Sequence, residues 1–178
     1  QMSVAEINHM RALYAAEVTM VDTWFGKFID KLRQMDLLDD SLLVVTSDHG
    51  HLLGEHGLSG KSAGSEYREV LDAVLMIRHP KGVGAGQRSN AFVQHQDICT
   101  TSLSFLGIDP KGKLDGIDLM PVLEGKQQQI RDYATCGHGV CVVCRDDQYV
   151  YLSRKNGEEP VLFDMKNDPG QLHNIAAD

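Results

Sequence analysis

A short apolar run that ends in an acid and an imidazole constrains this chain most. Leu42-Leu43-Val44-Val45 is followed directly by Thr46-Ser47-Asp48-His49-Gly50. Consecutive leucine and valine residues are typical of a buried strand in a parallel sheet, where both faces are covered. Open α/β sheets bind their ligands beyond the carboxyl ends of such strands. The run therefore predicts an α/β fold with chemistry at Asp48 and His49.

Asp48 and His49 are the predicted metal ligands. A carboxylate is a hard oxygen ligand and an imidazole is a borderline nitrogen ligand, so the pair suits a divalent cation from calcium through manganese to zinc. The alternative is a turn in which the Asp48 side chain bonds its own backbone. The Gly-rich, ionisable loop at 51–61 that follows favours a functional site, because loops on a rigid scaffold concentrate function.

Two histidines of this loop are candidates for substrate binding. His56 stands between Glu55 and Gly57, and the glycines around it free the backbone to present its side chain at the mouth of the crevice. The alternative for His56 is a hydrogen bond to Glu55. His51 follows His49 by two residues, so it faces either a substrate or the surface.

Further landmarks follow in a fixed order along the chain. They are Leu53–Gly57, Lys61, Tyr67–Glu69, Val74–Gly82, Gln96–Ile98, Leu106–Ile108, Asp115–Leu119 and Leu162–Pro169. Together with Val45–Gly50, this order resembles the sulfatases of the alkaline phosphatase superfamily, and the resemblance covers essentially all 178 residues. It implies part of an alkaline-phosphatase-like α/β sandwich at residues 1–130, with a smaller carboxy-terminal antiparallel β subdomain at residues 131–178.

The resemblance also implies parts of an active site that this sequence lacks. Sulfatases carry an upstream Cys/Ser-x-Pro/Ala-x-Arg signature, whose Cys or Ser becomes formylglycine, and two metal-binding acids near the amino terminus. The four cysteines here all follow the Asp-His motif, and none begins such a signature. We therefore expect the carboxy-terminal portion of a sulfatase-like protein with half an active site. A missing amino-terminal segment, or self-association, is the expected partner.

The resemblance predicts a metal-assisted hydrolase of sulfate monoesters, acting on a sulfated small molecule or carbohydrate. Charge builds on the leaving oxygen as the S–O bond breaks, so a cation held by Asp48 and His49 would stabilise the transition state. Lys61 would contact the sulfuryl oxygens as a compact point charge, with His56 beside it. Calcium is the expected ion, with manganese or zinc as alternatives, and the formylglycine nucleophile would come from the upstream segment.

Two other function classes stay open. His49 stands where many sulfatases have asparagine, which resembles the branch that includes iduronate-type and choline-type sulfatases and phosphonate monoester hydrolases. A phosphate or phosphonate monoester or diester hydrolase on the same scaffold is therefore one alternative. A non-catalytic interaction module is the other, although the joint presence of Asp48, His49 and Lys61 argues against it.

The composition limits the classes of partner and compartment that are expected for this chain. Hydrophobic residues make up 42% of the chain and charged residues 24%, as in globular domains with a core. The formal net charge of -8 argues against a nucleic-acid partner. No apolar run approaches the roughly 18 residues of a membrane span, and no signal peptide is visible. Clustered cysteines favour a cytoplasmic compartment, while a missing native amino terminus leaves the periplasm or a lysosome open.

Periodicity predicts the remaining elements. Apolar residues at steps of three and four between Ile7 and Met35 predict an amphipathic helix, whose stripe we expect to pack on the Leu42–Val45 strand. Ala73–Arg78 reads as another buried strand. Asp97 is the expected N-cap of a helix at 98–106, and a short helix is expected at 119–123. Short β-branched and aromatic runs after Arg131 predict an antiparallel meander.

A cysteine and histidine cluster supports a rival metal hypothesis. Cys136, His138, Cys141 and Cys144 lie within nine residues and include the ligand types of a zinc site. However, Cys141–Cys144 has the composition of a strand, in which an odd separation places the two thiols on opposite faces. We therefore favour core thiols over a metal site.

Overall fold

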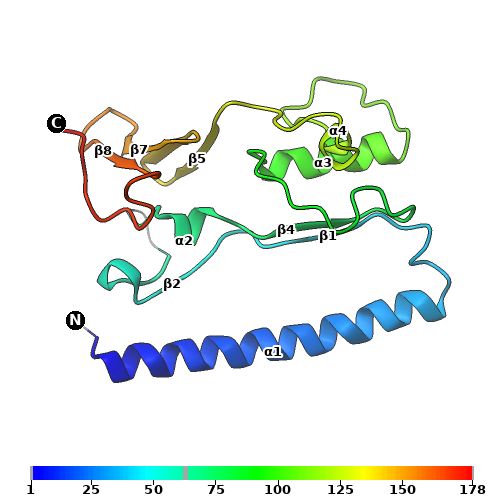
Figure 1. The fold of residues 1–178 in the computed structure, drawn as a ribbon, viewed down its shortest axis with the longest axis horizontal. Coiled ribbons are helices and arrows are strands. Elements are labelled where there is room, and N and C mark those ends of the chain that lie inside the picture. The colour runs from blue at the N-terminus through cyan, green and yellow to red at the C-terminus, as the bar shows by residue number, and fades with distance from the viewer. Residues whose placement is uncertain (1, 62–63, 178) are drawn as a thin grey trace.

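The computed structural model describes residues 2–61 and 64–177, with helices and strands in mixed order (Figure 1). The helices are α1 (Val4–Gln34), α2 (Arg68–Leu71), α3 (His95–Phe105), α4 (Met120–Leu123) and the 3-10 turn η1 (Glu55–Gly57). The strands are β1 (Leu43–Thr46), β2 (Leu52–Leu53), β3 (Ser59–Gly60), β4 (Leu75–Arg78), β5 (Ala134–His138), β6 (Cys141–Arg145), β7 (Tyr149–Arg154) and β8 (Val161–Asp164).

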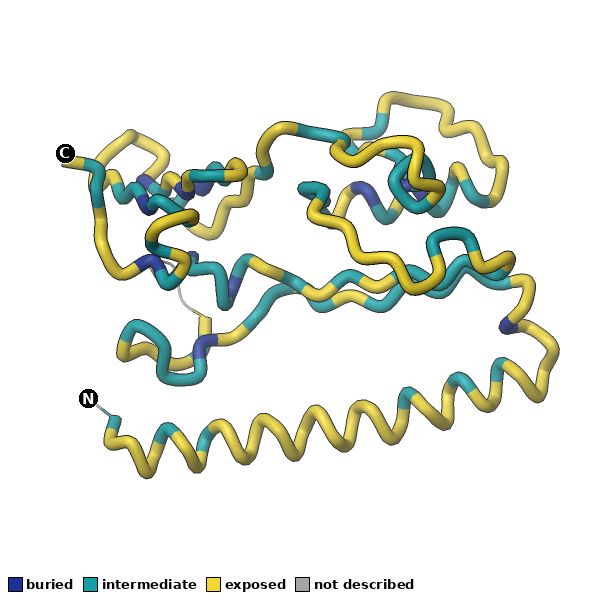
Figure 2. The backbone as a smooth tube through the Cα atoms, viewed as in Figure 1, coloured by how far each residue is buried: buried dark blue, intermediate teal, exposed yellow. Residues whose placement is uncertain are grey.

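The predicted amino-terminal helix is confirmed, but its packing is not. A capping box at Ser3 and Glu6 starts α1, and Lys31 and Arg33 complement its carboxyl end. No described residue of α1 is buried, so the apolar stripe does not pack on β1 as predicted (Figure 2). The helix is attached at its amino-terminal third, where Arg11 donates to the Leu53 carbonyl at 2.9 Å. Helical periodicity specifies an apolar face without specifying what covers it.

The strand predicted at Leu42–Val45 is present, but its parallel pairing is wrong. β1 pairs antiparallel with β4 in a two-stranded sheet, with Val44 opposite Ile77, and no residue of either strand is fully buried. Beyond the ladder, Ser47 and Val74 continue the contact, since the Ser47 hydroxyl accepts from the Val74 amide at 3.1 Å. Apolar runs alone do not encode strand direction, which is set by the route of the intervening chain.

Helix α3 begins three residues before the predicted start, and the Asp97 cap prediction is wrong. Gln94 is the N-cap, and Asp97 is the third helical residue of a capping box, accepting from the Gln94 amide at 2.7 Å. Asp97 is buried, and hydrogen bonds from Arg131 and from the Ile117 amide compensate the burial of its carboxylate. The short helix expected at 119–123 is confirmed as α4, with Pro121 in its first turn.

The predicted carboxy-terminal meander is confirmed as a four-stranded antiparallel sheet. Its order is β5-β6-β7-β8. Val143, Val150 and Phe163 are buried on one face, and Phe163 lies 6.2 Å from the Tyr67 ring beside α2. The sheet therefore shares a core with the segment around α2. No helix in the described part of the chain is both long and apolar enough to cross a membrane.

Candidate active site

The structure brings together Asp48, His49 and Lys61. The Asp48 Oδ2 lies 3.3 Å from the His49 Nε2, and the Asp48 Oδ1 accepts from the His49 amide at 3.0 Å. The Lys61 ammonium contacts the same Nε2 atom across a separation of twelve residues. The β2–β3 pair, with Leu52 opposite Gly60, returns the chain so that Lys61 meets the motif at the end of β1.

The backbone orients the His49 ring. Its Nδ1 lies 2.6 Å from the Gly50 carbonyl, which accepts hydrogen bonds and cannot donate them, so Nδ1 carries the proton. Nε2 is then an acceptor, and it is contacted by the Lys61 ammonium and lies 3.3 Å from the Asp48 Oδ2. A backbone carbonyl that holds the other ring nitrogen is the usual support of a metal-ligating histidine. The orientation therefore fits a role for His49 as an Nε2 ligand.

Gly50 fixes the motif against α2. Its amide donates to the Val70 carbonyl at 2.8 Å, and a Cβ at this position would stand 1.9 Å from the Glu69 carbonyl oxygen. Only glycine allows this approach. On the other side, the His95 ring lies 2.8 Å from the Ser47 carbonyl, so α3 also holds the end of β1. Sequence reasoning missed this support by His95, because no local pattern signals it.

Among the described residues, no contact joins His56 to Asp48, His49 or Lys61. The His56 ring stacks on Tyr67 at 3.6 Å, its side chain is 8% exposed, and its Nε2 lies 3.5 Å from the Glu69 Oε2. His56 has a φ of 56°, a left-handed conformation that non-glycine residues seldom adopt. The alternative contact with Glu55 is absent among the described residues, because Glu55 bonds the Leu53 amide and Arg11. A substrate role for His56 stays a prediction.

His51 contacts the amino-terminal helix. Its ring stacks with Tyr14 at 6.1 Å, and the residue is exposed. The structure therefore places His51 between α1 and the β2 strand, without a described contact to Lys61 or His49. Its predicted role in substrate binding is likewise untested.

The cysteine and histidine cluster does not form a metal centre. His138 is opposite Cys141 and shares a face with Cys136, whereas Cys144 is opposite Thr135, so Cys144 faces away from the other three. Within residues 2–61 and 64–177, no group of three or more His, Cys, Asp or Glu side chains is arranged to hold a metal. The same finding means that Asp48 and His49 have no third such ligand among the described residues.

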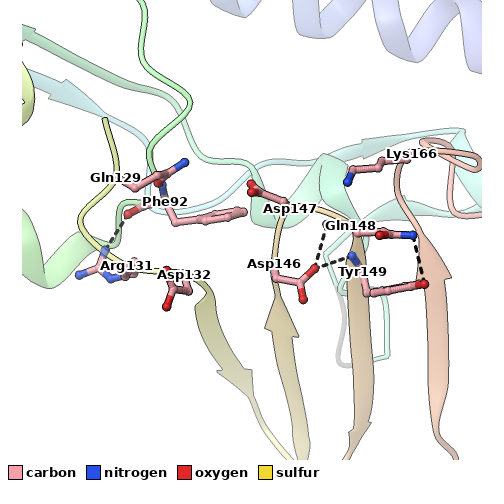
Figure 3. Close-up of a pocket in the computed structure, with 9 residues that line it drawn as sticks. All are labelled: Phe92, Gln129, Arg131, Asp132, Asp146, Asp147, Gln148, Tyr149 and Lys166. Atoms are coloured by element: carbon pink, nitrogen blue, oxygen red, sulfur yellow. Dashed lines mark hydrogen bonds between the residues drawn. The ribbon is translucent and has the colours of Figure 1, made fainter. Parts of the chain in front are cut away.

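A cavity of about 330 Å³ lies elsewhere, between the α3 side and the carboxy-terminal sheet. Figure 3 shows Phe92 and Arg131 on one side of it and the β6–β7 turn on the other. None of Asp48, His49 and Lys61 lines this cavity. The motif instead stands on an open surface, where the Asp48 side chain is 84% exposed.

A comparison with protein-family models identifies the family whose members carry this motif. The family model of the sulfatases matches residues 1–108, which include Asp48, His49 and Lys61. The chain belongs to the sulfatase family. The sulfatase resemblance read from the sequence landmarks is thus confirmed, together with the α/β fold class.

Individual sulfatase relatives agree over nearly the whole chain. An N-acetylglucosamine-6-O-sulfatase of Bacteroides thetaiotaomicron is 31% identical over 91% of the chain. BT4656, solved in complex with its substrate D-glucosamine-2-N,6-O-disulfate, is 32% identical with a TM-score of 0.79 over 89% of the chain. The phosphonate monoester hydrolase SpPMH of Silicibacter pomeroyi is 28% identical with a TM-score of 0.87 over 97%. The chain spans 31%, 34% and 38% of these proteins, respectively.

Sulfatases generally use a divalent metal and a formylglycine. The donor set here fits such a metal in part. The Asp48 Oδ2 and the His49 Nε2 approach each other to 3.3 Å, and the His49 tautomer leaves a lone pair on Nε2, which the Lys61 ammonium contacts in this structure and which could bind an ion in its place. The carboxylate and the imidazole are ligands that calcium, manganese and zinc accept to different degrees.

Proposed function

We propose that this chain supplies Asp48, His49 and Lys61 to the active site of a metal-assisted sulfate monoester hydrolase. The observation that carries the proposal is the meeting of the Lys61 ammonium with the His49 Nε2, beside the Asp48 carboxylate. The Lys61 ammonium, together with a metal ion held by Asp48 and His49, can neutralise an anionic ester group. Membership in the sulfatase family supports sulfate esters as the substrate class.

Each residue has a distinct part in the proposed chemistry. Asp48 and His49 would hold the divalent ion, which when bound stabilises negative charge on the sulfuryl group and the leaving oxygen. Lys61 would contact the sulfuryl or bridging oxygen and hold it by charge, because an ammonium on a flexible stem acts as a point charge. Gly50 and His95 keep the two ligands in register by fixing the backbone around them.

The remaining parts of the site would come from outside these 178 residues. We propose that the chain works within a longer polypeptide, since the relatives it matches are about three times its length. That polypeptide would contribute the formylglycine nucleophile and the further acidic ligands. By analogy with the relative that hydrolyses glucosamine disulfate, the proposed substrate is a sulfated carbohydrate.

Hydrolysis of 4-nitrophenyl sulfate by the complete polypeptide tests the proposal. We expect Lys61→Ala to lower kcat/KM by about 100- to 1000-fold, which is the cost of removing one group that stabilises transition-state charge. Lys27→Ala is the matched control, because Lys27 lies on α1 over the Trp24 ring and has no described contact with the motif. Equal activity of the Lys61→Ala and Lys27→Ala variants would refute the role of Lys61.

A phosphonate or phosphate ester hydrolase is the second candidate. The similarity to SpPMH, with a TM-score of 0.87, favours it. Phosphonate esters carry a tetrahedral anionic centre like that of sulfate esters, so the same three residues serve either substrate. Parallel assays of 4-nitrophenyl sulfate and 4-nitrophenyl phenylphosphonate distinguish the two candidate functions. The ester with the larger kcat/KM identifies the preferred reaction.

A further inference from the structure

The β2–β3 hairpin (residues 52–60) and α2 support different members of the Asp48-His49-Lys61 cluster (Figure 1). Lys61 directly follows β3, so the hairpin carries the ammonium that contacts His49. The Val70 carbonyl of α2 accepts from the Gly50 amide at 2.8 Å, and the Gly50 carbonyl lies 2.6 Å from the His49 Nδ1. The position of Lys61 relative to His49 therefore depends on how the hairpin sits against α2.

His56 lies in the turn of the hairpin and joins it to α2. Its ring stacks on that of Tyr67, the N-cap of α2, with the ring centroids 3.6 Å apart and the planes inclined by 8°. Its Nε2 lies 3.5 Å from the Glu69 Oε2, and neither atom has a hydrogen-bond partner among the described residues. With a side chain only 8% exposed, His56 contacts α2 rather than solvent.

The backbone at His56 adopts an uncommon conformation to make this contact. Its φ of 56° lies in the left-handed region, and such a conformation persists where surrounding contacts determine it. The turn is held by its own hydrogen bonds, because the Leu58 carbonyl accepts from the Gly54 amide at 3.0 Å and the Leu58 amide donates to the Glu55 carbonyl at 2.9 Å. A fixed turn thus presents the His56 ring to Tyr67.

We propose that His56 is a positioning residue that fixes the β2–β3 hairpin, and with it Lys61, against the helix that supports His49. The stacked ring makes the connection, so this role replaces the direct substrate contact that the sequence predicts for His56. The catalytic consequence rests on the proposed function, since it assumes that Lys61 contacts the sulfuryl group. The structural consequence, a fixed position of Lys61 beside His49, is the same for any ester.

Acetylation of Lys61 tests the structural consequence in the complete polypeptide. After treatment with a chelator, the rate with limiting N-hydroxysuccinimidyl acetate is measured by peptide mass spectrometry, with Lys27 as the internal reference. The contact with His49 engages the nitrogen atom that the reagent attacks. His56→Asn tolerates the left-handed backbone but removes the ring. We expect it to raise the Lys61 rate about two- to tenfold, the population change that loss of one aromatic pair allows. His56→Phe keeps a flat ring on Tyr67 and should keep the original rate.

Two further variants define the contact. His173→Asn is the matched control, because it makes the same substitution at a histidine whose side chain is 80% exposed, and it should leave the Lys61 rate unchanged. Tyr67→Ala removes the other half of the stack, so it should raise the rate as His56→Asn does. The double variant should raise it no further, because both substitutions remove the same contact.

The kinetic consequence is measured on the same variants with 4-nitrophenyl sulfate. We expect His56→Asn to lower kcat about 10- to 100-fold with KM nearly unchanged, as when a reacting group is displaced by about 1 Å. His56→Phe should retain most of the kcat, although phenylalanine cannot hydrogen-bond a substrate. This rescue distinguishes a ring that positions Lys61 from an imidazole that touches the ester.

The outcomes separate the two proposals. A wild-type polypeptide without ester hydrolysis refutes the proposed function, and the acetylation rates still decide the role of His56. Equal Lys61 acetylation in His56→Asn and His173→Asn overturns the positioning role. A His56→Phe variant that keeps its melting temperature but loses as much kcat as His56→Asn also overturns it, in favour of a substrate contact. So does a rise in acetylation that is equal at Lys61 and at the other lysines, because a general loss of structure would then explain it.

Discussion

Arg131 donates one hydrogen bond of 2.6 Å to each carboxylate oxygen of Asp97. The pair is enclosed, with the Asp97 side chain 0% and the Arg131 side chain 11% exposed. Asp97 also accepts from the Gln94 amide and the Ile117 amide. This bidentate pair therefore joins the start of α3 to the segment that enters the carboxy-terminal sheet, and α3 in turn supports the end of β1 through His95.

Removing the arginine should destabilise the fold strongly. We expect Arg131→Ala to lower the free energy of unfolding by about 3–5 kcal/mol, because it leaves a buried carboxylate without its cation. Arg33→Ala is the control, since Arg33 pairs with Asp30 at 2.7 Å on the exposed face of α1 and should cost at most about 0.5 kcal/mol. Urea denaturation measures both values. An equal loss of unfolding free energy in the two variants would show that the buried Asp97–Arg131 pair stabilises the fold no more than an exposed pair does.

Acid should weaken the fold partly through Asp97. Burial acts to raise the pKa of Asp97, but hydrogen bonds from Arg131, Ile117 and Gln94 outweigh it and lower that pKa below its ordinary value of 3.8. The stabilisation is therefore fully present above about pH 4 and is lost as pH falls through the lowered folded pKa. The difference in unfolding free energy between wild type and Asp97→Asn should shrink below pH 3.8. A difference that is constant from pH 7 to pH 3 would contradict this linkage.

Two glycine substitutions should have opposite effects. Gly50→Ala forces a Cβ within 1.9 Å of the Glu69 carbonyl oxygen, so we expect a loss of at least about 2 kcal/mol and a displaced Asp48-His49 motif. Gly26→Ala meets nothing within 4 Å in the middle of α1, and alanine favours helix by about 1 kcal/mol. Thermal denaturation of both variants checks the contrast. A stable Gly50→Ala protein would mean that the close approach to Glu69 can relax.

The exposed face of α1 should drive association of the 178-residue chain. Tyr14, Val18, Val21 and Phe28 share one helical face and are all exposed. Such a face is covered in stable proteins, so we expect self-association in light scattering unless an amino-terminal segment covers it. Val21→Lys should reduce the apparent mass, whereas Met20→Lys, on another side of the helix, should reduce it less. A strictly monomeric, folded chain would count against the prediction.

Calcium binding should depend on residues beyond this chain. Asp48 and His49 offer two side-chain ligands, whereas calcium takes about six to eight oxygen ligands. We expect the 178-residue chain to bind calcium weakly in calorimetry and the complete polypeptide to bind it tightly. Asp48→Ala in the complete polypeptide should lose the ion and the activity together, and chelation should abolish activity. Submicromolar binding by the chain alone would show that the assumed ligand set is incomplete.

Local sequence patterns were sufficient to identify most helices and strands and to place the Asp48-His49 motif at the end of a strand. Short β-branched and aromatic runs identified the four strands of the carboxy-terminal sheet, and apolar residues at steps of three and four identified α1. The Asp48-His49 pair could be placed at the end of a strand because polar residues follow an apolar run directly. These features depend on neighbours within a few residues, where backbone geometry and side-chain spacing act.

Only the tertiary structure decided how those elements meet. The antiparallel direction of β4 against β1, the place of Asp97 inside α3 and the stack of His56 on Tyr67 each depend on contacts between residues far apart or on the path of a loop. The contact between His138 and Glu66 spans 72 positions (138 − 66 = 72). Such pairings are selected by burial and hydrogen bonding in the folded chain, which no local period encodes. The sequence pattern thus identified Asp48, His49 and Lys61 as candidates, and the fold places their three side chains in contact.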